Sequence, residues 1–317
     1  MPGAIQGIPL DILVLAVAVL LDLTLGEFPN RIHPTVWIGR TVSWGEQLAP
    51  RSNGGALLVG ALLALLLPGL WAGAAYLVGQ GLQHLHDLAY ILGGGLLLKS
   101  TFSLRTLHRV AARVRALLLA GDLPGVRAEM RSLVSRDASN LSPQQATAAT
   151  VESVSENLTD SFIAPWLAFA LFGLPGAFAY RAINTLDSMI GYHGKYEYLG
   201  KVSARLDDLV NLIPARLSAL LLLLGSGILP GQRVGGAWRV MWRDHGRTES
   251  PNAGWTMSGM AGALGVALEK EGHYRLGDAT RPLEPRDISR AVQTMYLVAA
   301  LGALIALGLI FLRHEFF

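Results

Sequence analysis

The residues of this sequence most able to do chemistry are a row of carboxylates, Glu152, Glu156 and Asp160. Their spacing places them on one face of a helix, because residues four apart are neighbours on a helical surface. No Lys or Arg lies between residues 137 and 160 to neutralise them. Mg²⁺ binds through one or two carboxylates together with substrate phosphates. The row is therefore a candidate Mg²⁺ site, and a solvated acidic helix face is the alternative.

A strong helix start precedes this row. Ser142 is a good N-cap, Pro143 suits the first helical position, and Gln145 completes a capping box. The pattern predicts a helix that runs from this point towards Thr159.

A second polar pattern consists of Arg181, Asn184 and either Asp187 or Ser188, one strip on an otherwise apolar helix. Charged groups at the edge of hydrocarbon are costly, so such a strip indicates a functional site. The following segment, residues 191–195, reads as a glycine-flanked loop that presents Tyr192 and Lys195.

The run from Arg205 to Arg216 repeats this theme with Asp207, Asp208 and Asn211. A simple ion pair between Arg205 and one of the aspartates is the alternative to a functional role. Further along, Ser250-Pro251-Asn252 has the composition of a turn.

The elements that must position these side chains are those of a membrane protein. Of the 317 residues, 51% are hydrophobic and only 15% are charged, whereas soluble domains carry about 25% charge. The absence of cysteine excludes disulfide scaffolds, thiolate metal sites and cysteine nucleophiles. The net charge of +3 is too balanced for a nucleic-acid-binding protein.

We expect an all-α, polytopic integral membrane protein of the inner (cytoplasmic) membrane. Hydropathy and the positions of Lys and Arg predict an outside N-terminus and about four crossings, at residues 10–25, 56–78, 85–98 and 291–312. Two weaker segments read as a re-entrant hairpin broken at Gly173-Leu174-Pro175-Gly176 and as a buried or shallow helix, at residues 162–183 and 217–229. Full crossings at these two places are the alternative.

We expect residues 1–317 to form a single membrane-embedded domain. The expected cytoplasmic segments are about 27–53, 99–160, 184–216 and 231–290. They contain the polar patterns described above except Arg181, which lies at the end of the predicted re-entrant hairpin.

Five blocks of the sequence resemble one known family. They are Asn30–Pro34, Glu152–Asp160, Arg181–Tyr192, Ala204–Arg216 and Ser250–Trp255. In combination they are similar to the adenosylcobinamide-phosphate synthases of cobalamin biosynthesis. The chain departs from the family pattern at Glu27, where members often have Asp, and after Trp255, where Thr256 and Met257 replace Pro-Glu.

The resemblance implies ATP-dependent amide formation between adenosylcobyric acid and (R)-1-amino-2-propanol phosphate, with Mg²⁺. It implies that the acidic row (Glu152, Glu156 and Asp160) binds Mg²⁺ and that Arg181, Lys195, Arg205 and Arg216 bind phosphates. Asp187 or Asp208 would deprotonate the amine, with His33 and His245 as further proton-transfer candidates. The substrate-binding set implied is Arg181, Asn184, Tyr192, Lys195, Arg205, Asn211, Arg216, Ser250 and Asn252.

The expected partners are the two substrates, ATP and membrane lipid, together with other membrane enzymes of cobalamin assembly, and no nucleic acid. A non-catalytic membrane regulator, of the β-lactamase-induction sensor type that the family also resembles, is one alternative. A transporter whose polar strip lines a path is another.

Overall fold

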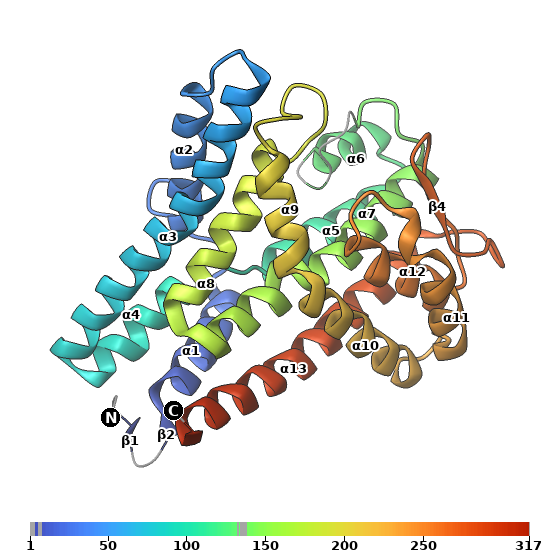
Figure 1. The fold of residues 1–317 in the computed structure, drawn as a ribbon. Coiled ribbons are helices and arrows are strands. Elements are labelled where there is room, and N and C mark those ends of the chain that lie inside the picture. The colour runs from blue at the N-terminus through green and yellow to red at the C-terminus, as the bar shows by residue number, and fades with distance from the viewer. Residues whose placement is uncertain (1–3, 6–7, 132, 134–137, 317) are drawn as a thin grey trace. The chain divides into compact units, whose positions relative to one another are not determined.

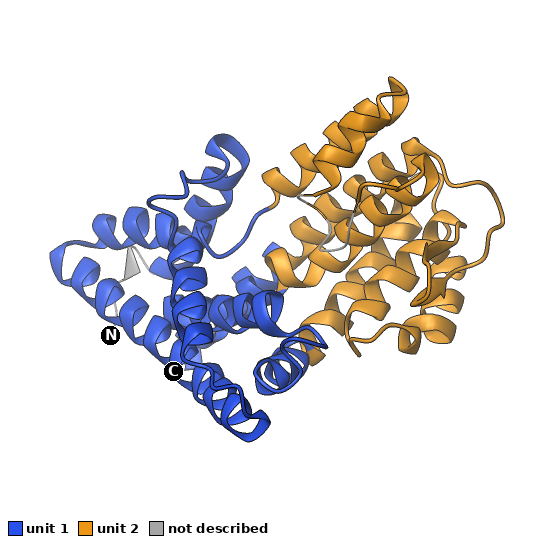
Figure 2. Ribbon diagram, turned by 90° about the horizontal axis from the view of Figure 1, so that it is seen from above, with its two compact units in different colours: residues 1–103, 164–211, 303–317 blue, residues 104–163, 212–302 orange. Residues whose placement is uncertain are grey.

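The computed structural model describes residues 4–5, 8–131, 133 and 138–316, and almost all regular structure in these residues is helical (Figure 1). The chain divides into two compact units, which Figure 2 colours separately. Unit 1 comprises residues 1–103, 164–211 and 303–317, and unit 2 comprises residues 104–163 and 212–302. The sequence patterns did not indicate this division. The all-helical fold class is confirmed.

Unit 1 is a group of helices with one very short hairpin. Its elements are β1 (Ala4–Ile5), β2 (Ile8–Pro9), α1 (Leu10–Leu25), α2 (Pro34–Gln47), α3 (Asn53–Leu85), α4 (Asp87–Lys99), α8 (Ala164–Ile190), α9 (Lys201–Val210) and the last part of α13 (Pro285–Phe316). The two strands pair antiparallel, with Ile5 opposite Ile8.

Unit 2 has shorter helices and a second hairpin. Its elements are α5 (Arg105–Leu119), α6 (Leu123–Met130), α7 (Pro143–Leu158), the π-helix η1 (Thr159–Ile163), α10 (Leu212–Ile228), α11 (Val234–Asp244), the 3₁₀-helix η2 (His245–Arg247), α12 (Ala253–Leu264), β3 (Leu268–Lys270), β4 (Tyr274–Leu276) and the first part of α13. Strands β3 and β4 pair antiparallel, with Leu268 opposite Leu276.

Three helical stretches are long and apolar enough to cross a membrane, namely residues 53–85, 143–190 and 285–316. Helices α9 and α10, bent by 48° at their junction, form a fourth if they count as one stretch. Two of the predicted crossings lie within α3 and α13. The other two fall on α1 and α4, which have only 16 and 13 residues. By length and composition, residues 143–190 and the α9–α10 pair are thus additional candidate spans where no crossing was expected. The identity of the helices that cross the membrane stays a prediction.

The break predicted within residues 162–183 is confirmed. Gly173 adopts φ 66° inside α8, a left-handed conformation that favours glycine. A Cβ on Gly176 would lie 2.4 Å from the carbonyl oxygen of Ala168, so the chain doubles back closely after the break. A cavity of about 390 Å³ lies beside it. Arg313 pairs with Asp11 at its edge.

The capping box predicted at Ser142 is also present, with both reciprocal hydrogen bonds formed. Helix α7 ends at Leu158 and continues as the π-helix η1. A π-turn holds more residues than an α-turn. The regular spacing expected for the acidic row therefore stops before Asp160.

The apolar core that positions α8 and α9 in unit 1 is formed by Val42, Leu67, Leu186, Ile190 and Leu199, all buried. Leu186 and Ile190 point into this core from α8, so the residues between them on the helix are turned towards its other faces. The loop from residue 191 to residue 200 then returns the chain to α9.

Candidate functional site

A buried carboxylate and two hydrogen-bonded side chains lie between α8 and α9 in unit 1. Asn211 donates from Nδ2 to Oδ2 of Asp207 over 2.9 Å, and the hydroxyl of Tyr180 donates to Oδ1 of Asn211 over 3.0 Å. Among the described residues, the other oxygen of Asp207, Oδ1, is buried and accepts no hydrogen bond. A buried polar atom in this state is expected to have a partner in the functional protein. We refer to Asp207, Asn211, Tyr180, Asn184 and Asp187 as the carboxylate cluster.

The predicted strip on α8 joins this cluster. Asn184 lies within reach of the Asp207 carboxylate, and the charges of Asp187 and Asp207 act on one another. Arg181 lies 3.4 Å from Oδ1 of Asn184 through Nη1. The backbone of Gly191 packs directly against the Asp187 carboxylate, because a Cβ on Gly191 would lie 2.0 Å from Oδ1 of Asp187.

Three of the expected substrate-binding residues in unit 1 are more exposed than this cluster. Arg205 extends into solvent and pairs with Asp208 over 3.4 Å, which is the ion pair weighed from the sequence. Lys195 donates to Oε1 of Glu46 over 2.9 Å. Tyr192 is exposed in the loop after α8. Asp208 is half-buried beside the cluster and pairs with the exposed Arg205.

A second polar group in unit 1, the Glu27 cluster, was not predicted as a unit. Lys99 is almost completely buried, with Nζ 2.9 Å from Oε2 of Glu27 and 3.3 Å from Oδ1 of Asp22. The ring of Phe28 lies under the same ammonium group, at 5.5 Å. His33 lies 2.8 Å from Oε2 of Glu27 through Nε2.

Contacts with this lysine and histidine set the charge state of Glu27. Burial raises the pKa of Glu27, but hydrogen bonds from His33, Ser103 and Lys99 and the charge of Lys99 outweigh burial and lower the pKa to about 2. The Nδ1 atom of His33 accepts from the backbone N–H of Thr35, so the ring proton lies on Nε2 and points to Glu27. Both ring nitrogens are thus occupied in a structural role at the start of α2.

In unit 2, Arg216 is fixed by an amide and an aromatic ring. Its Nη1 donates to Oδ1 of Asn252 over 2.5 Å, and its guanidinium lies 5.0 Å from the ring of Trp255. Ser250 accepts a hydrogen bond on its hydroxyl from the backbone N–H of Asn252. The turn predicted at residues 250–252 thus brings together three of the expected binding residues. We call Arg216, Asn252, Trp255 and His245 the arginine–aromatic cluster.

His245 differs from His33 in the nitrogen that it leaves available. Its Nδ1 lies 3.1 Å from the carbonyl oxygen of Met241. A carbonyl only accepts, so the proton lies on Nδ1 and the lone pair on Nε2. The ring packs against Trp255 at 4.1 Å between centroids. Of the two histidine candidates, His245 is the one whose geometry suits a proton acceptor.

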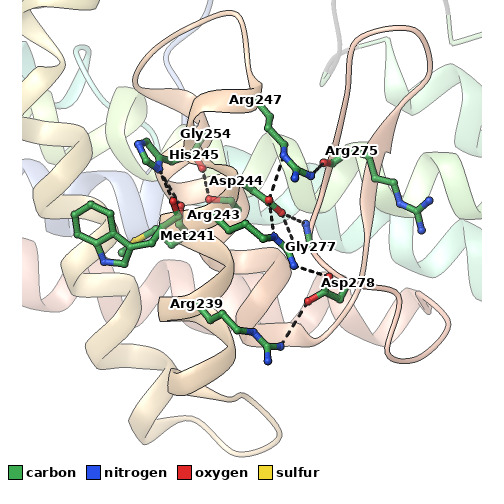
Figure 3. A network of polar contacts seen from close by, with 12 residues as sticks. Arg239, Met241, Arg243, Asp244, His245, Arg247, Gly254, Arg275, Gly277 and Asp278 are labelled. Atoms are coloured by element: carbon green, nitrogen blue, oxygen red, sulfur yellow. Dashed lines mark hydrogen bonds and ion pairs between the residues drawn. The ribbon is translucent and has the colours of Figure 1, made fainter.

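An ionic network around the buried carboxylate of Asp244 holds the segment that carries His245 (Figure 3). Asp244 is fully buried, and Arg243 donates to both of its oxygens over 2.8 Å. The backbone N–H of Gly277 and the guanidinium of Arg247 also bind Asp244. Burial raises the pKa of Asp244, but these hydrogen bonds and charges outweigh burial and hold it below its ordinary value.

The acidic row does not form a three-carboxylate metal site. Among the described residues, no three Asp, Glu, His or Cys side chains lie close enough together to hold a metal ion. Glu152 is buried, Glu156 is exposed and Asp160 is half-buried on the π-helix. A role for one or two of them toward Mg²⁺ stays a prediction.

Sequence reasoning missed several residues of these clusters. The sequence patterns gave no role to Lys99, and none to Asp207 or Trp255 in particular. The spacing of Asp207 and Asn211, four residues apart on one helix, was a usable signal. Nothing local pairs Lys99 with Glu27, which lies 72 residues earlier.

Comparison with known proteins shows one family. The family model described as CobD/Cbib protein matches residues 15–295. The chain is 43% identical over 301 residues to "Cobalamin biosynthesis protein CobD" of Dehalococcoides mccartyi, covering 95% of this chain and 97% of the relative. It is 39% identical to "Probable cobalamin biosynthesis protein CobD" of Methanothermobacter thermautotrophicus, over 94% of this chain and 97% of the relative. It is 38% identical to "Cobalamin biosynthesis protein CbiB" of Salmonella choleraesuis, over 92% and 95%.

No solved structure matches the chain. The family model spans most of the sequence, and so do relatives well above 30% identity. The chain therefore belongs to the CobD/CbiB family of cobalamin biosynthesis proteins.

Proposed function

We propose that this protein is an ATP-dependent ligase that joins adenosylcobyric acid to (R)-1-amino-2-propanol phosphate. The product is adenosylcobinamide phosphate. The observation that supports a catalytic protein most directly is Asp207, a buried carboxylate with one oxygen that accepts no hydrogen bond among the described residues. Family membership supplies the pathway.

Amide formation from a carboxylate requires activation of the acid. A carboxylate oxygen of adenosylcobyric acid attacks the γ-phosphorus of ATP, the bond to the β-phosphate oxygen breaks, and ADP leaves. The amine then attacks the acyl carbon and phosphate departs. When bound, Mg²⁺ would neutralise phosphoryl charge, held by Glu156 or Asp160 together with the nucleotide phosphates.

The substrate amine arrives as an ammonium ion and must lose a proton before it attacks. Asp207 is suited to accept this proton, because the bond from Asn211 to Oδ2 holds the buried carboxylate in place beside Asn184. The second proton of the nitrogen leaves with phosphate. Arg216, oriented by Asn252 and Trp255, suits a phosphate group.

The decisive experiment uses the purified protein in detergent with ATP, Mg²⁺, adenosylcobyric acid and aminopropanol phosphate. We expect ADP, phosphate and adenosylcobinamide phosphate in equal amounts. A folded sample that forms no product with all four components would overturn the ligase proposal. Substrate flux into proteoliposomes without turnover would instead identify a transporter.

The Mg²⁺ assignment has a separate test. Glu156→Gln should reduce turnover strongly at limiting Mg²⁺ and leave expression and thermal stability unchanged, because Glu156 is exposed. Full activity at every Mg²⁺ concentration would remove this residue from the mechanism.

A further inference from the structure

We propose that α11 is an interfacial helix, with one face in the headgroup region of the bilayer. This face consists of Val234, Trp238 and Trp242, which recur every four residues. Their exposed fractions are 49%, 51% and 52%. Residues at this spacing form a continuous stripe along a helix. We call it the tryptophan stripe.

The other side of α11 is already packed. Ala237, Val240 and Met241 are buried, and α12 lies against this side. The helices approach so closely that a Cβ on Gly236 would lie 2.5 Å from the carbonyl oxygen of Gly262. The orientation of α11 on its unit is therefore fixed, and the tryptophan stripe faces outwards from it.

The stripe continues an apolar face of α10. Leu220, Leu224 and Ile228 are all more than half exposed and follow the same four-residue spacing. A Cβ on Gly227 would lie 3.9 Å from the Cβ of Val234, so the end of α10 meets the start of α11. Helix α10 belongs, with α9, to a stretch apolar enough to cross a membrane. A lipid-facing surface on α10 would thus pass directly into the tryptophan stripe.

Charge next to the stripe identifies the lipid headgroups as its occupant. Arg239 follows Trp238 of the stripe by one residue, about 100° around the helix. Arg243 follows Trp242 in the same way, but its guanidinium is already bound by Asp244 and Asp278. The side chain of Arg239 is 68% exposed, although it also approaches Asp278 at 3.5 Å. Indole rings favour the membrane interface, and guanidinium groups beside them bind lipid phosphates.

An interfacial α11 would also place the arginine–aromatic cluster at a defined depth in the membrane. Trp242 lies 5.3 Å from the ring of Trp255 and 6.0 Å from that of His245, measured between centroids. The proposed phosphate site at Arg216 would accordingly lie at the level of the headgroups. This last step rests on the proposed function, whereas the position of α11 does not.

The absence of cysteine from the chain allows a direct test. Val234→Cys and Trp238→Cys would each carry a single spin label in nanodiscs containing anionic lipid. We expect these labels to collide with oxygen more than with a water-soluble nickel chelate. Glu271→Cys, in the exposed turn between β3 and β4, should show the reverse. Equal nickel accessibility at all three positions would overturn the proposal, as would labels shielded from both reagents by a second copy of the chain.

A second measurement, of tryptophan fluorescence, uses Trp→Phe variants that keep the stripe apolar. Brominated lipids should quench part of the tryptophan fluorescence of the wild-type protein, and Trp238→Phe/Trp242→Phe should remove much of that part. Trp166→Phe, at a buried indole, serves as the matched control and should not. An unchanged quenched fraction in the double variant would contradict lipid contact. Labels at position 238 that respond only to added corrinoid or ATP would instead identify a stacking surface for a ligand.

Discussion

Two adjacent aspartates on α9 have different surroundings, and this difference predicts different roles. Asp207 is buried between amide and hydroxyl partners, whereas Asp208 pairs with a guanidinium that is 79% exposed. Asp207→Asn should lower the rate of amide formation by about 10²-fold or more. Asp208→Asn should change it only slightly. Rates of product formation at saturating substrates decide between them, and equal losses in both variants would argue against a special role for Asp207.

His245 allows a test that separates proton transfer from packing. His245→Asn keeps an N–H near the position of Nδ1 that can donate to Met241, but it lacks the basic nitrogen. If His245 accepts a proton, this variant should lower kcat at saturating substrates and leave thermal stability unchanged. A variant with wild-type kcat and pH profile would show that the ring only packs against Trp255.

Glu27 predicts a pH dependence of stability. Its pKa falls from 4.5 to about 2 on folding, so its ionised form stabilises the fold above the unfolded value. That contribution decreases as the pH falls from 4.5 towards 2. The difference in melting temperature between wild type and Glu27→Gln should therefore be constant near neutral pH and shrink on acidification. A difference that stays constant down to pH 3 would contradict the role of the ionised carboxylate.

At the scale of elements, α3 contains one glycine whose position has no room for a side chain, Gly60, and one whose position is open, Gly69. A Cβ on Gly60 would lie 1.9 Å from the carbonyl oxygen of Leu199, in the loop that precedes α9. Around Gly69 on the same helix nothing lies within 4 Å. Gly60→Ala should destabilise the protein by roughly 1–3 kcal/mol, and Gly69→Ala should be neutral or stabilising by up to about 1 kcal/mol. Thermal unfolding in one detergent compares the two, and similar melting temperatures would contradict the close approach at Gly60.

The elements show which features a sequence can reveal. The start of α7 at Ser142 and the break at Gly173 were predictable, since both depend on neighbours within a few residues. The polar strip on α8 was predictable from helical spacing. The π-helix after Leu158 has no local composition signal, and it interrupts the acidic row.

Contacts between distant residues were not predictable in the same way. The Glu27 cluster joins the end of α1 to the end of α4, and hydropathy placed Lys99 only at the edge of a predicted crossing, without a partner. Motif similarity could nevertheless mark candidate positions, because it does not require knowledge of their partners, and their roles stay predictions. Geometry then separated His245 from His33 and Asp207 from Asp208.

On the scale of the whole molecule, the two units share the predicted site residues between them. The carboxylate cluster belongs to unit 1, and the arginine–aromatic cluster belongs to unit 2. Each unit is assembled from separate parts of the chain. Neither unit can therefore be completed until the last helix has been made.

Membrane orientation gives a prediction at this scale. Loops without Lys and Arg are expected outside, and basic segments inside. In intact spheroplasts, Gln83→Cys should react with a membrane-impermeant maleimide, and Glu271→Cys should react only after permeabilisation. Reaction of both from outside would exclude the predicted orientation.

The pairing of Lys99 with Glu27 has a consequence for biogenesis. The carboxylate is synthesised 72 residues before its ammonium partner, which at about 5–20 residues per second is a delay of roughly 4–14 s. During this interval Asp22 and Glu27 have no lysine to neutralise them at the end of α1. The negatively charged end of the first helix can therefore gain the Lys99 ammonium group, which offsets part of its charge in the fold, only after α4 has been made.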